Sequence, residues 1–391
     1  MAEIPGLVCL TAQPVPMKRN TVISICKGMA IILMVMGHAD CPGVLSKFLY
    51  EFHMPLFFIT AGYFFSLRYL DDETTFVKKR LRGLYVPFVM WSVFFLCIHN
   101  LMFSIGILNE QYGNWTGGVT HPYTWHQAEQ RLWNIVTAMG GYDEFLCGAF
   151  WFFRGLLVAS LLYLLLYKVG VWLWRKTAHA GPEGMALRLW IPLGVCLAAL
   201  ALAGWKSAEN LKIITLVQGG YRDLMGCFFF GVGFLFHEWQ HRYKPSWWST
   251  LLFVGVVGLF SVYATANMNW RSSFEQFLSL PVPAICGFLM TFNIATLIDR
   301  HDNRLRRSLV YIGDHTLPIF IFHIVSFKLV SVFKIMYYDM EWAQIGCHMV
   351  VHDHSADDWF WLPYTVVGVA LPLLLDWTWH QIVRGKELSA K

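Results

Sequence analysis

Hydrophobic residues run along most of this chain in long windows, each bounded by a short polar or charged connection. Several windows exceed the roughly 18 uncharged residues that mark a membrane-spanning helix. The pattern therefore predicts an all-α fold, a polytopic transmembrane helical bundle of about ten spans. The predicted spans cover residues 21–40, 52–70, 83–106, 147–168, 188–205, 222–237, 248–266, 279–298, 309–334 and 360–379.

Every second connection between the predicted spans is basic. Lys and Arg in short connections stay on the cytoplasmic side of a membrane, so this alternation places both termini in the cytoplasm. The opposite connections, notably 107–146 and 335–359, are poor in cations or acidic. The basic connections carry Lys18 and Arg19; Lys78, Lys79, Arg80 and Arg82; Arg175, Lys176 and Arg188; Arg242 and Lys244; Arg300, Arg304, Arg306 and Arg307; and Arg384 and Lys386.

Composition agrees with a membrane protein and excludes an ordinary soluble domain. The 391 residues are 56% hydrophobic and 17% aromatic, and only 14% are charged; a soluble domain has about 25% charged residues. The net charge of +5 is concentrated in the connections, so it indicates topology and not nucleic-acid binding. The nine cysteines are scattered singly, which is typical of small buried hydrophobic residues and not of a disulfide or zinc framework.

We expect one membrane domain at residues 21–380, between a cytoplasmic N-terminal segment, 1–20, and a cytoplasmic tail, 381–391. The sequence contains no internal repeat and no soluble module. The first sixteen residues lack the basic head and apolar run of a signal peptide, and Met17 is expected to be the natural start.

The first span contains two ionisable residues, Lys27 and His38, with ten residues between them. Eleven steps make almost three helical turns, so the two residues share one face about 16 Å apart. Ionisable groups within a span are costly and usually face a cavity. Lys27 could hold a phosphate at the cytoplasmic end, and the His38 imidazole could accept a proton from a hydroxyl. A snorkelling lysine and a histidine hydrogen-bonded between helices would explain the pair equally well.

The second span begins at His53, in the same outer half of the bilayer as His38. Three small residues in a row, Thr60, Ala61 and Gly62, allow another helix to approach closely. The span therefore combines a second outer imidazole with a packing surface.

The outer connections contain two patterns of uncertain meaning. One is rich in aromatic residues around Tyr112 and Trp115, which could form a sugar-facing platform or simply anchor the chain at the interface. The other places His348 and His352 four residues apart beside Asp353. That spacing alone is a weak metal signal, and a solvated loop without metal is expected.

The chain resembles the acyltransferase-3 family of bacterial integral membrane acyltransferases. The resemblance rests on Lys27-x10-His38, on Phe57-Phe58-x-x-Ala61-Gly62-Tyr63-Phe64, on the basic Lys79-Arg80-Leu81-Arg82 loop and on the ten spans. The family pattern has Ser where this chain has Ala61, and an Arg pair where it has Lys79 and Arg82. Because lysine lacks the bidentate fork of arginine, we keep Lys79, Arg80 and Arg82 together as candidate phosphate ligands.

Two later segments extend the resemblance. The fourth span opens with Trp151 in Phe150-Trp151-Phe152-Phe153-Arg154-Gly155-Leu156, which places Arg154 within apolar sequence. The ninth carries Gly313-Asp314-His315-Thr316-Leu317-Pro318-Ile319-Phe320-Ile321-Phe322-His323, with a second intramembrane imidazole that could orient the acceptor or His38, or bond a neighbouring helix. Arg154, and Lys328 further along the ninth span, could be functional or could snorkel.

The resemblance implies an O-acyltransferase that uses acyl-CoA, most simply acetyl-CoA, as co-substrate, with no metal. It implies catalytic roles for His38 and His323, with His38 as general base or transient acyl carrier. Acetyl-CoA would be held by Lys27, Lys79, Arg80 and Arg82. The acceptor, a cell-surface glycan or its lipid-linked precursor, would meet His53, Tyr63, Trp151 and Arg154.

Two other classes of function remain open from the sequence. A carrier or flippase that exports a glycan precursor would use intramembrane charges as a translocation path, although carriers often have two similar halves. A structural partner in a polysaccharide assembly complex is the other. The expected setting is the inner membrane of a bacterium, among membrane lipids and without nucleic acid; homo-oligomer formation is left open.

Overall fold

The computed structural model describes residues 20–113, 121–140, 144–177, 183–209, 220–268, 278–353 and 358–389, and within these ranges every regular element is helical. The helices are α1 Thr21–His38, α2 Gly43–Tyr50, α3 His53–Tyr63, α4 Glu73–Arg80, α5 Val86–Ser104, α6 Trp125–Ala138, α7 Glu144–Cys147, α8 Trp151–Thr177, α9 Glu183–Met185, α10 Ile191–Ala208, α11 Tyr221–Trp239, α12 Trp247–Tyr263, α13 Pro281–Asp299, α14 Arg304–Asp314, α15 Thr316–Tyr337 and α16 Trp361–Ser389. Short 3₁₀ or π-helical turns cover Leu67–Leu70, Leu81–Tyr85, Ala186–Trp190, Gln240–Arg242 and Trp342–Gly346. The predicted N-terminal segment up to residue 19 and Trp115 lie outside the described residues.

The helices confirm the predicted all-α membrane fold. Each of the ten predicted windows contains a helix, and seven described helices are long and apolar enough to cross a bilayer. The prediction was too long for the second window, because α3 has only 11 residues. Such a helix is about 16 Å long, roughly half the hydrocarbon thickness. We call the end of the bundle that carries the basic connections the inner end, and the opposite one the outer end.

Two segments differ from the predicted layout. The basic loop around Lys79 and Arg82 is helical and joins α4 to α5 through a π-helical turn. The predicted span 309–334 is divided into α14 and α15. Pro318 explains the division, because it has no N–H to donate to the Asp314 carbonyl four residues earlier.

Glycines set the closest helix crossings. A Cβ on Gly62 of α3 would overlap the Phe230 carbonyl of α11, and one on Gly233 of α11 would overlap the Ile59 carbonyl of α3. In the same way, Gly28 of α1 lies against the backbone of α14. This close approach of backbones is how membrane helices gain packing energy without a hydrophobic driving force.

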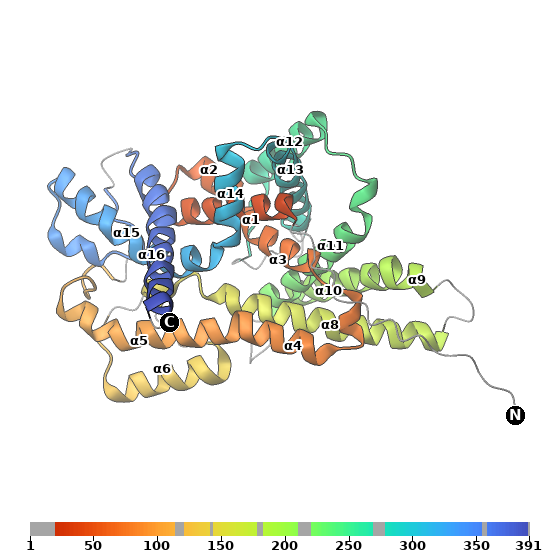
Figure 1. Cartoon of the computed structure of the whole chain (residues 1–391), viewed down its shortest axis with the longest axis horizontal. Coiled ribbons are helices and arrows are strands. Elements are labelled where there is room, and N and C mark those ends of the chain that lie inside the picture. Colours follow the sequence, from red (N-terminus) through yellow and green to blue (C-terminus); the bar gives the residue numbers. More distant parts are fainter. Residues whose placement is uncertain are drawn as a thin grey trace, which may run out of the picture.

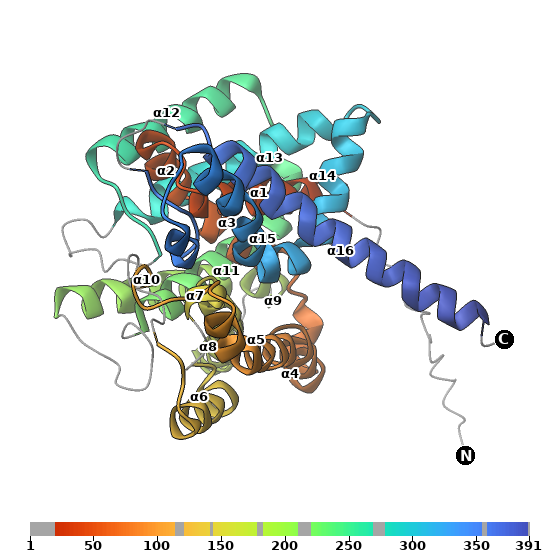
Figure 2. The ribbon, with the colours of Figure 1, turned by 90° about the vertical axis from the view of Figure 1, so that its left-hand side faces the viewer.

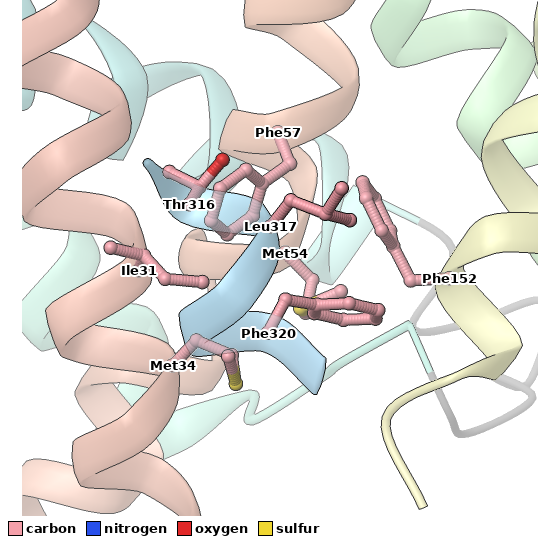
Figure 3. Close-up of a pocket in the computed structure, with 8 residues that line it drawn as sticks. All are labelled: Ile31, Met34, Met54, Phe57, Phe152, Thr316, Leu317 and Phe320. Atoms are coloured by element: carbon pink, nitrogen blue, oxygen red, sulfur yellow. The ribbon is translucent and has the colours of Figure 1, made fainter. Parts of the chain in front are cut away.

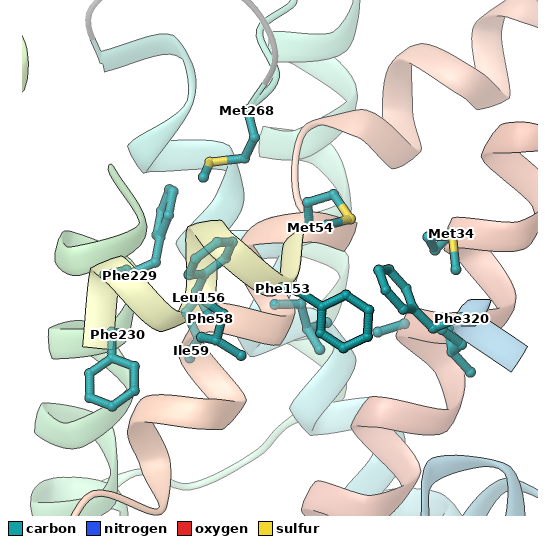
Figure 4. Packing of buried hydrophobic residues seen from close by; sticks show 14 of the residues in the cluster. Met34, Met54, Phe58, Ile59, Phe153, Leu156, Phe229, Phe230, Met268 and Phe320 are labelled. Carbon is teal, nitrogen blue, oxygen red and sulfur yellow. The ribbon is translucent and has the colours of Figure 1, made fainter. Parts of the chain in front are cut away.

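The arrangement places α1, α3 and α15 around one interior. In Figure 1, α5, α8 and α10 run in the same general direction, and α1, α13 and α14 lie above them. Figure 2 shows the C-terminal part of α16 projecting from the rest. Buried aromatic rings fill the interior, and Figure 4 shows Phe58, Phe153 and Phe320 in this core, on α3, α8 and α15.

A polar network joins α12 to α13, and it carries a stability prediction. Asn293 donates to Ser249 and Thr250, both at 3.0 Å, and accepts from the Tyr243 hydroxyl at 2.8 Å. Replacing Asn293 by leucine removes these three hydrogen bonds and leaves the Tyr243 hydroxyl without its acceptor, which should destabilise the fold by about 1–2 kcal/mol. The thermal midpoint of the purified protein should fall, whereas Ile294→Val on the same helix should leave it nearly unchanged. Equal midpoints would contradict the prediction.

Candidate active site

Two imidazoles from different helices meet at the outer part of the interior. His38 is the last residue of α1, and His323 is fully buried on α15. Nδ1 of His38 lies 2.9 Å from Nε2 of His323, and the two rings stack with centroids 5.1 Å apart. The structure thus brings together the two residues that the sequence analysis proposed as catalytic. A purely structural histidine pair would form the same interhelical hydrogen bond. The positions of the protons therefore distinguish a catalytic pair from a structural one.

The partners of His323 determine which nitrogen carries each proton in the neutral pair. Nδ1 of His323 lies 3.1 Å from the carbonyl oxygen of Ile319 and 3.0 Å from that of Phe320. Carbonyl oxygens only accept, so this nitrogen holds the proton and Nε2 of His323 is an acceptor. His38 must then donate from Nδ1, which leaves its Nε2 with a lone pair. An imidazole in this state is ready to accept a proton.

Other histidines lie near His38. His53 and His348 lie close enough to His38 for electrostatic interaction. His53 is buried at the start of α3 and donates from Nδ1 to the Leu49 carbonyl at 2.7 Å. His352 lies 3.0 Å from Asp40. Among the described residues, no three His, Cys, Asp or Glu side chains converge as metal ligands, and neighbouring His354 lies outside those residues.

A narrow cavity of about 60 Å³ lies just inside the histidine pair. Ile31 and Met34 line it from α1 (Figure 3). These positions continue the helical face that begins at Lys27 and ends at His38. The other lining residues are Met54, Phe57, Phe152, Thr316, Leu317 and Phe320. The cavity is therefore nearly apolar, and it lies on the route between the two ionisable groups of α1.

The inner end of this route is walled by α13, which ends at Asp299, and by α14, which ends at Asp314. Ser24 of α1 donates a hydrogen bond to Asp314 at 2.8 Å, and Thr21 donates to Asp299 at 2.9 Å. Lys27, between these contacts and Ile31, is half-buried. The close packing of Gly28 on α14 fixes the rotation of α1. The lysine consequently stays on the cavity face.

The three candidate phosphate ligands of α4 and its continuation do not share one environment. Lys79 donates to the Tyr69 hydroxyl at 3.3 Å. The Arg80 guanidinium packs over the rings of Phe76 and Phe230, at 5.0 and 5.2 Å. Arg82 is exposed. Lys79 and Arg80 therefore contact aromatic rings, while both Lys79 and Arg82 are open to solvent.

An outer cluster contains two of the predicted acceptor residues and two that the sequence analysis missed. The Arg222 guanidinium lies 4.2 Å from the centre of the Trp151 ring, and its Nε donates to the Met268 carbonyl at 3.2 Å. Both Arg154 and Arg222 lie close enough to Asp223 for electrostatic interaction. The sequence contains a signal for these two residues, because Arg222 and Asp223 are adjacent charges at the start of an apolar window. Only the fold shows that they meet the fourth span.

Tyr63 is not brought to this outer cluster. It ends α3 at the inner end, where its hydroxyl donates to Gln240 at 2.9 Å and accepts from Asn20 at 2.7 Å. Asn20 also caps α1 through the Ile23 N–H. The structure thus gives the Tyr63 hydroxyl two inner-end partners, far along α1 from His38.

Lys328 holds an outer connection in place. Its Nζ donates to the carbonyls of Ile345 and Cys347, at 2.7 and 2.6 Å. Lys334, further along α15, forms an ion pair with Asp358 at 2.5 Å. Neither lysine snorkels freely. Together they fasten the connection that carries His348 near the histidine pair.

A protein-family model matches nearly the whole chain. Residues 20–377 match the family model Acyl_transf_3, described as an acyltransferase domain. No curated protein and no solved structure matches the chain.

Proposed function

Because it matches over nearly its whole length, the chain belongs to the acyltransferase-3 family of membrane acyltransferases, and we propose that it moves an acetyl group from acetyl-CoA to a sugar hydroxyl. The donor is cytoplasmic, the acceptor is a cell-surface glycan or its lipid-linked precursor, and the setting is a bacterial inner membrane. The observation that carries this proposal is the His38–His323 pair, which leaves Nε2 of His38 with a lone pair, one helical turn beyond the cavity-lining Met34.

The chemistry needs one base and no oxidant. Nε2 of His38 accepts the proton of the acceptor hydroxyl while the oxygen attacks the thioester carbonyl. The carbon–sulfur bond breaks, the new ester forms, and the proton passes from the imidazolium to the leaving thiolate. Nδ1 of His38 donates to His323 throughout, so the imidazolium keeps a partner in a medium where an unpaired charge is costly.

The donor would enter from the inner end. Lys27 and His38 lie about 16 Å apart along α1, a span that an extended pantetheine arm can bridge. The CoA phosphates would lie near Lys27 and the basic residues Lys79, Arg80 and Arg82. Lys79 and Arg82 are both exposed, and Arg80 is only partly so. The narrow apolar cavity supports this route, because Ile31 and Met34, which line it, lie between Lys27 and His38 on one face of α1.

The acceptor would approach from the outer end. Trp151 supplies a flat ring, and Arg154 lies on the next turn of α8. His53 lies close to His38 at the start of α3. These groups can hold a sugar by stacking and hydrogen bonding while one hydroxyl faces Nε2 of His38.

The test uses the full chain reconstituted in liposomes, with acetyl-CoA outside and candidate glycans within. We expect release of free CoA thiol only when an acceptor glycan is present, and an equal amount of glycan ester by mass spectrometry. Thiol release without an acceptor would show hydrolysis and would contradict glycan transfer. Movement of a glycan across the bilayer with neither thiol nor ester would instead identify a carrier.

A further inference from the structure

A groove on the lipid-facing side of the bundle lies apart from the histidine pair. It has a volume of about 650 Å³ and is bounded by α5, α15 and α16. Met90, Phe322 and Leu375 line it, one from each helix. Met90 and Leu375 are more than half exposed, so the groove opens to the outside of the bundle.

The groove belongs to the inner half of the membrane. α5 continues from the basic helix α4, and Met90 lies only five residues into it. α16 runs the other way, and its apolar part ends at Val383. Asp376 precedes this end by seven residues, or about 10 Å. The exposed rings of Trp377 and Trp379 follow Asp376 in the chain. Tryptophan prefers the headgroup level of a bilayer.

Asp376 directly follows the apolar run 369–375 of α16. Its carboxylate faces the groove and lies 3.7 Å from Nε2 of His380. It forms no ion pair with a lysine or arginine among the side chains that the structure describes. A carboxylate at the headgroup level attracts the cationic part of a lipid headgroup. The groove therefore combines an apolar trough with a negative charge at the level of the lipid headgroups.

We propose that the groove binds one hydrocarbon chain of an inner-leaflet phospholipid whose primary ammonium headgroup pairs with Asp376. The Asp376 carboxylate distinguishes between two ligands with a similar hydrocarbon chain, a long-chain acyl-CoA and an aminophospholipid. A long-chain acyl-CoA would place its phosphates beside a carboxylate, which repels them. An aminophospholipid instead brings the missing cation to it.

The lipid would also support the donor cavity. Leu317, in the first turn of α15, lines both the groove and the 60 Å³ cavity and is partly exposed. The break between α14 and α15 lies just before this turn, and Pro318 in it has no N–H to continue α14. A chain lying in the groove packs against the same turn and holds the cavity wall.

The test compares two lipids on the purified full chain. The protein is equilibrated with equimolar phosphatidylethanolamine and phosphatidylglycerol of identical chains, then freed of loosely bound lipid and measured by native mass spectrometry. The wild type should retain phosphatidylethanolamine with a preference of about fivefold, the size expected of a partly exposed ion pair. Asp376→Asn should retain the two lipids about equally.

Matched variants separate the groove from general effects. Met90→Trp, which fills the groove, should lower retention of both lipids, and Leu329→Trp, on an exposed face of α15 outside the groove, should change neither. Asp302→Asn, an exposed carboxylate elsewhere, should keep the wild-type preference. The proposal is overturned if the wild type shows no preference, if Asp376→Asn keeps it, or if palmitoyl-CoA displaces phosphatidylethanolamine. No acyl transfer is measured, so either result leaves the enzymatic proposal to its own test.

Discussion

Replacing His38 by alanine is expected to lower the rate of acyl transfer by about 10³-fold. The variant loses the only basic nitrogen that the His38–His323 pair directs away from itself, and a positioned general base contributes roughly 10²–10⁴-fold. His38→Gln keeps a polar side chain that can still bond His323 but cannot take a proton at the same atom, so it should be as slow as alanine. The measurement is acceptor-dependent CoA release, with ester formation on the glycan as a second readout.

A matched control keeps this result interpretable. His126→Ala removes an imidazole from an exposed site on α6, and it should transfer at the wild-type rate. Both His38 variants must also elute and melt like the wild type, because α1 is a central helix. Transfer at an undiminished rate by a well-folded His38→Ala protein would remove the chemical basis of the proposed function.

The sequence was most informative where a feature repeats along one helix. Lys27 and His38 share a face because helical periodicity alone places them there, and the cavity lies on that face at Ile31 and Met34. The same holds for the membrane fold, since long apolar windows have few alternatives. Local periodicity therefore places Lys27, His38 and the cavity-lining positions on one face of α1.

The sequence pattern does not predict features that depend on contacts between helices. Nothing in the pattern places Arg222 of α11 over Trp151 of α8, or Tyr63 beside Asn20. The break before α15 could be expected from the sequence, because Pro318 cannot continue a helix. The apolar window that spans it nevertheless predicted one continuous helix. The hydrogen bond between His38 and His323 could be predicted only in part. Each imidazole was identifiable alone, but only the crossing of α1 and α15 shows which nitrogens face each other.

Replacing His323 by leucine is expected to lower the rate of transfer by about 10²–10³-fold, although His323 is a positioning residue that acts through His38. Its Nε2 accepts from Nδ1 of His38, and without an acceptor there His38 can place its proton on Nε2 and lose the basic nitrogen that faces the acceptor. Loss of the group that fixes a tautomer costs roughly 10⁴-fold in a serine protease. A smaller loss is expected here, because a neutral imidazole stabilises an imidazolium less than a carboxylate does.

His323→Gln distinguishes this role from mere packing. The glutamine Oε1 can accept the same proton, so the variant should recover transfer to within about tenfold of the wild type, whereas leucine, of comparable size, should not. The loss should appear in kcat with KM for acetyl-CoA nearly unchanged, since the donor passage is intact. If glutamine and leucine were equally slow and equally destabilised, His323 would serve only to pack α15 against α1, and the directionality of the His38 imidazole would need another source.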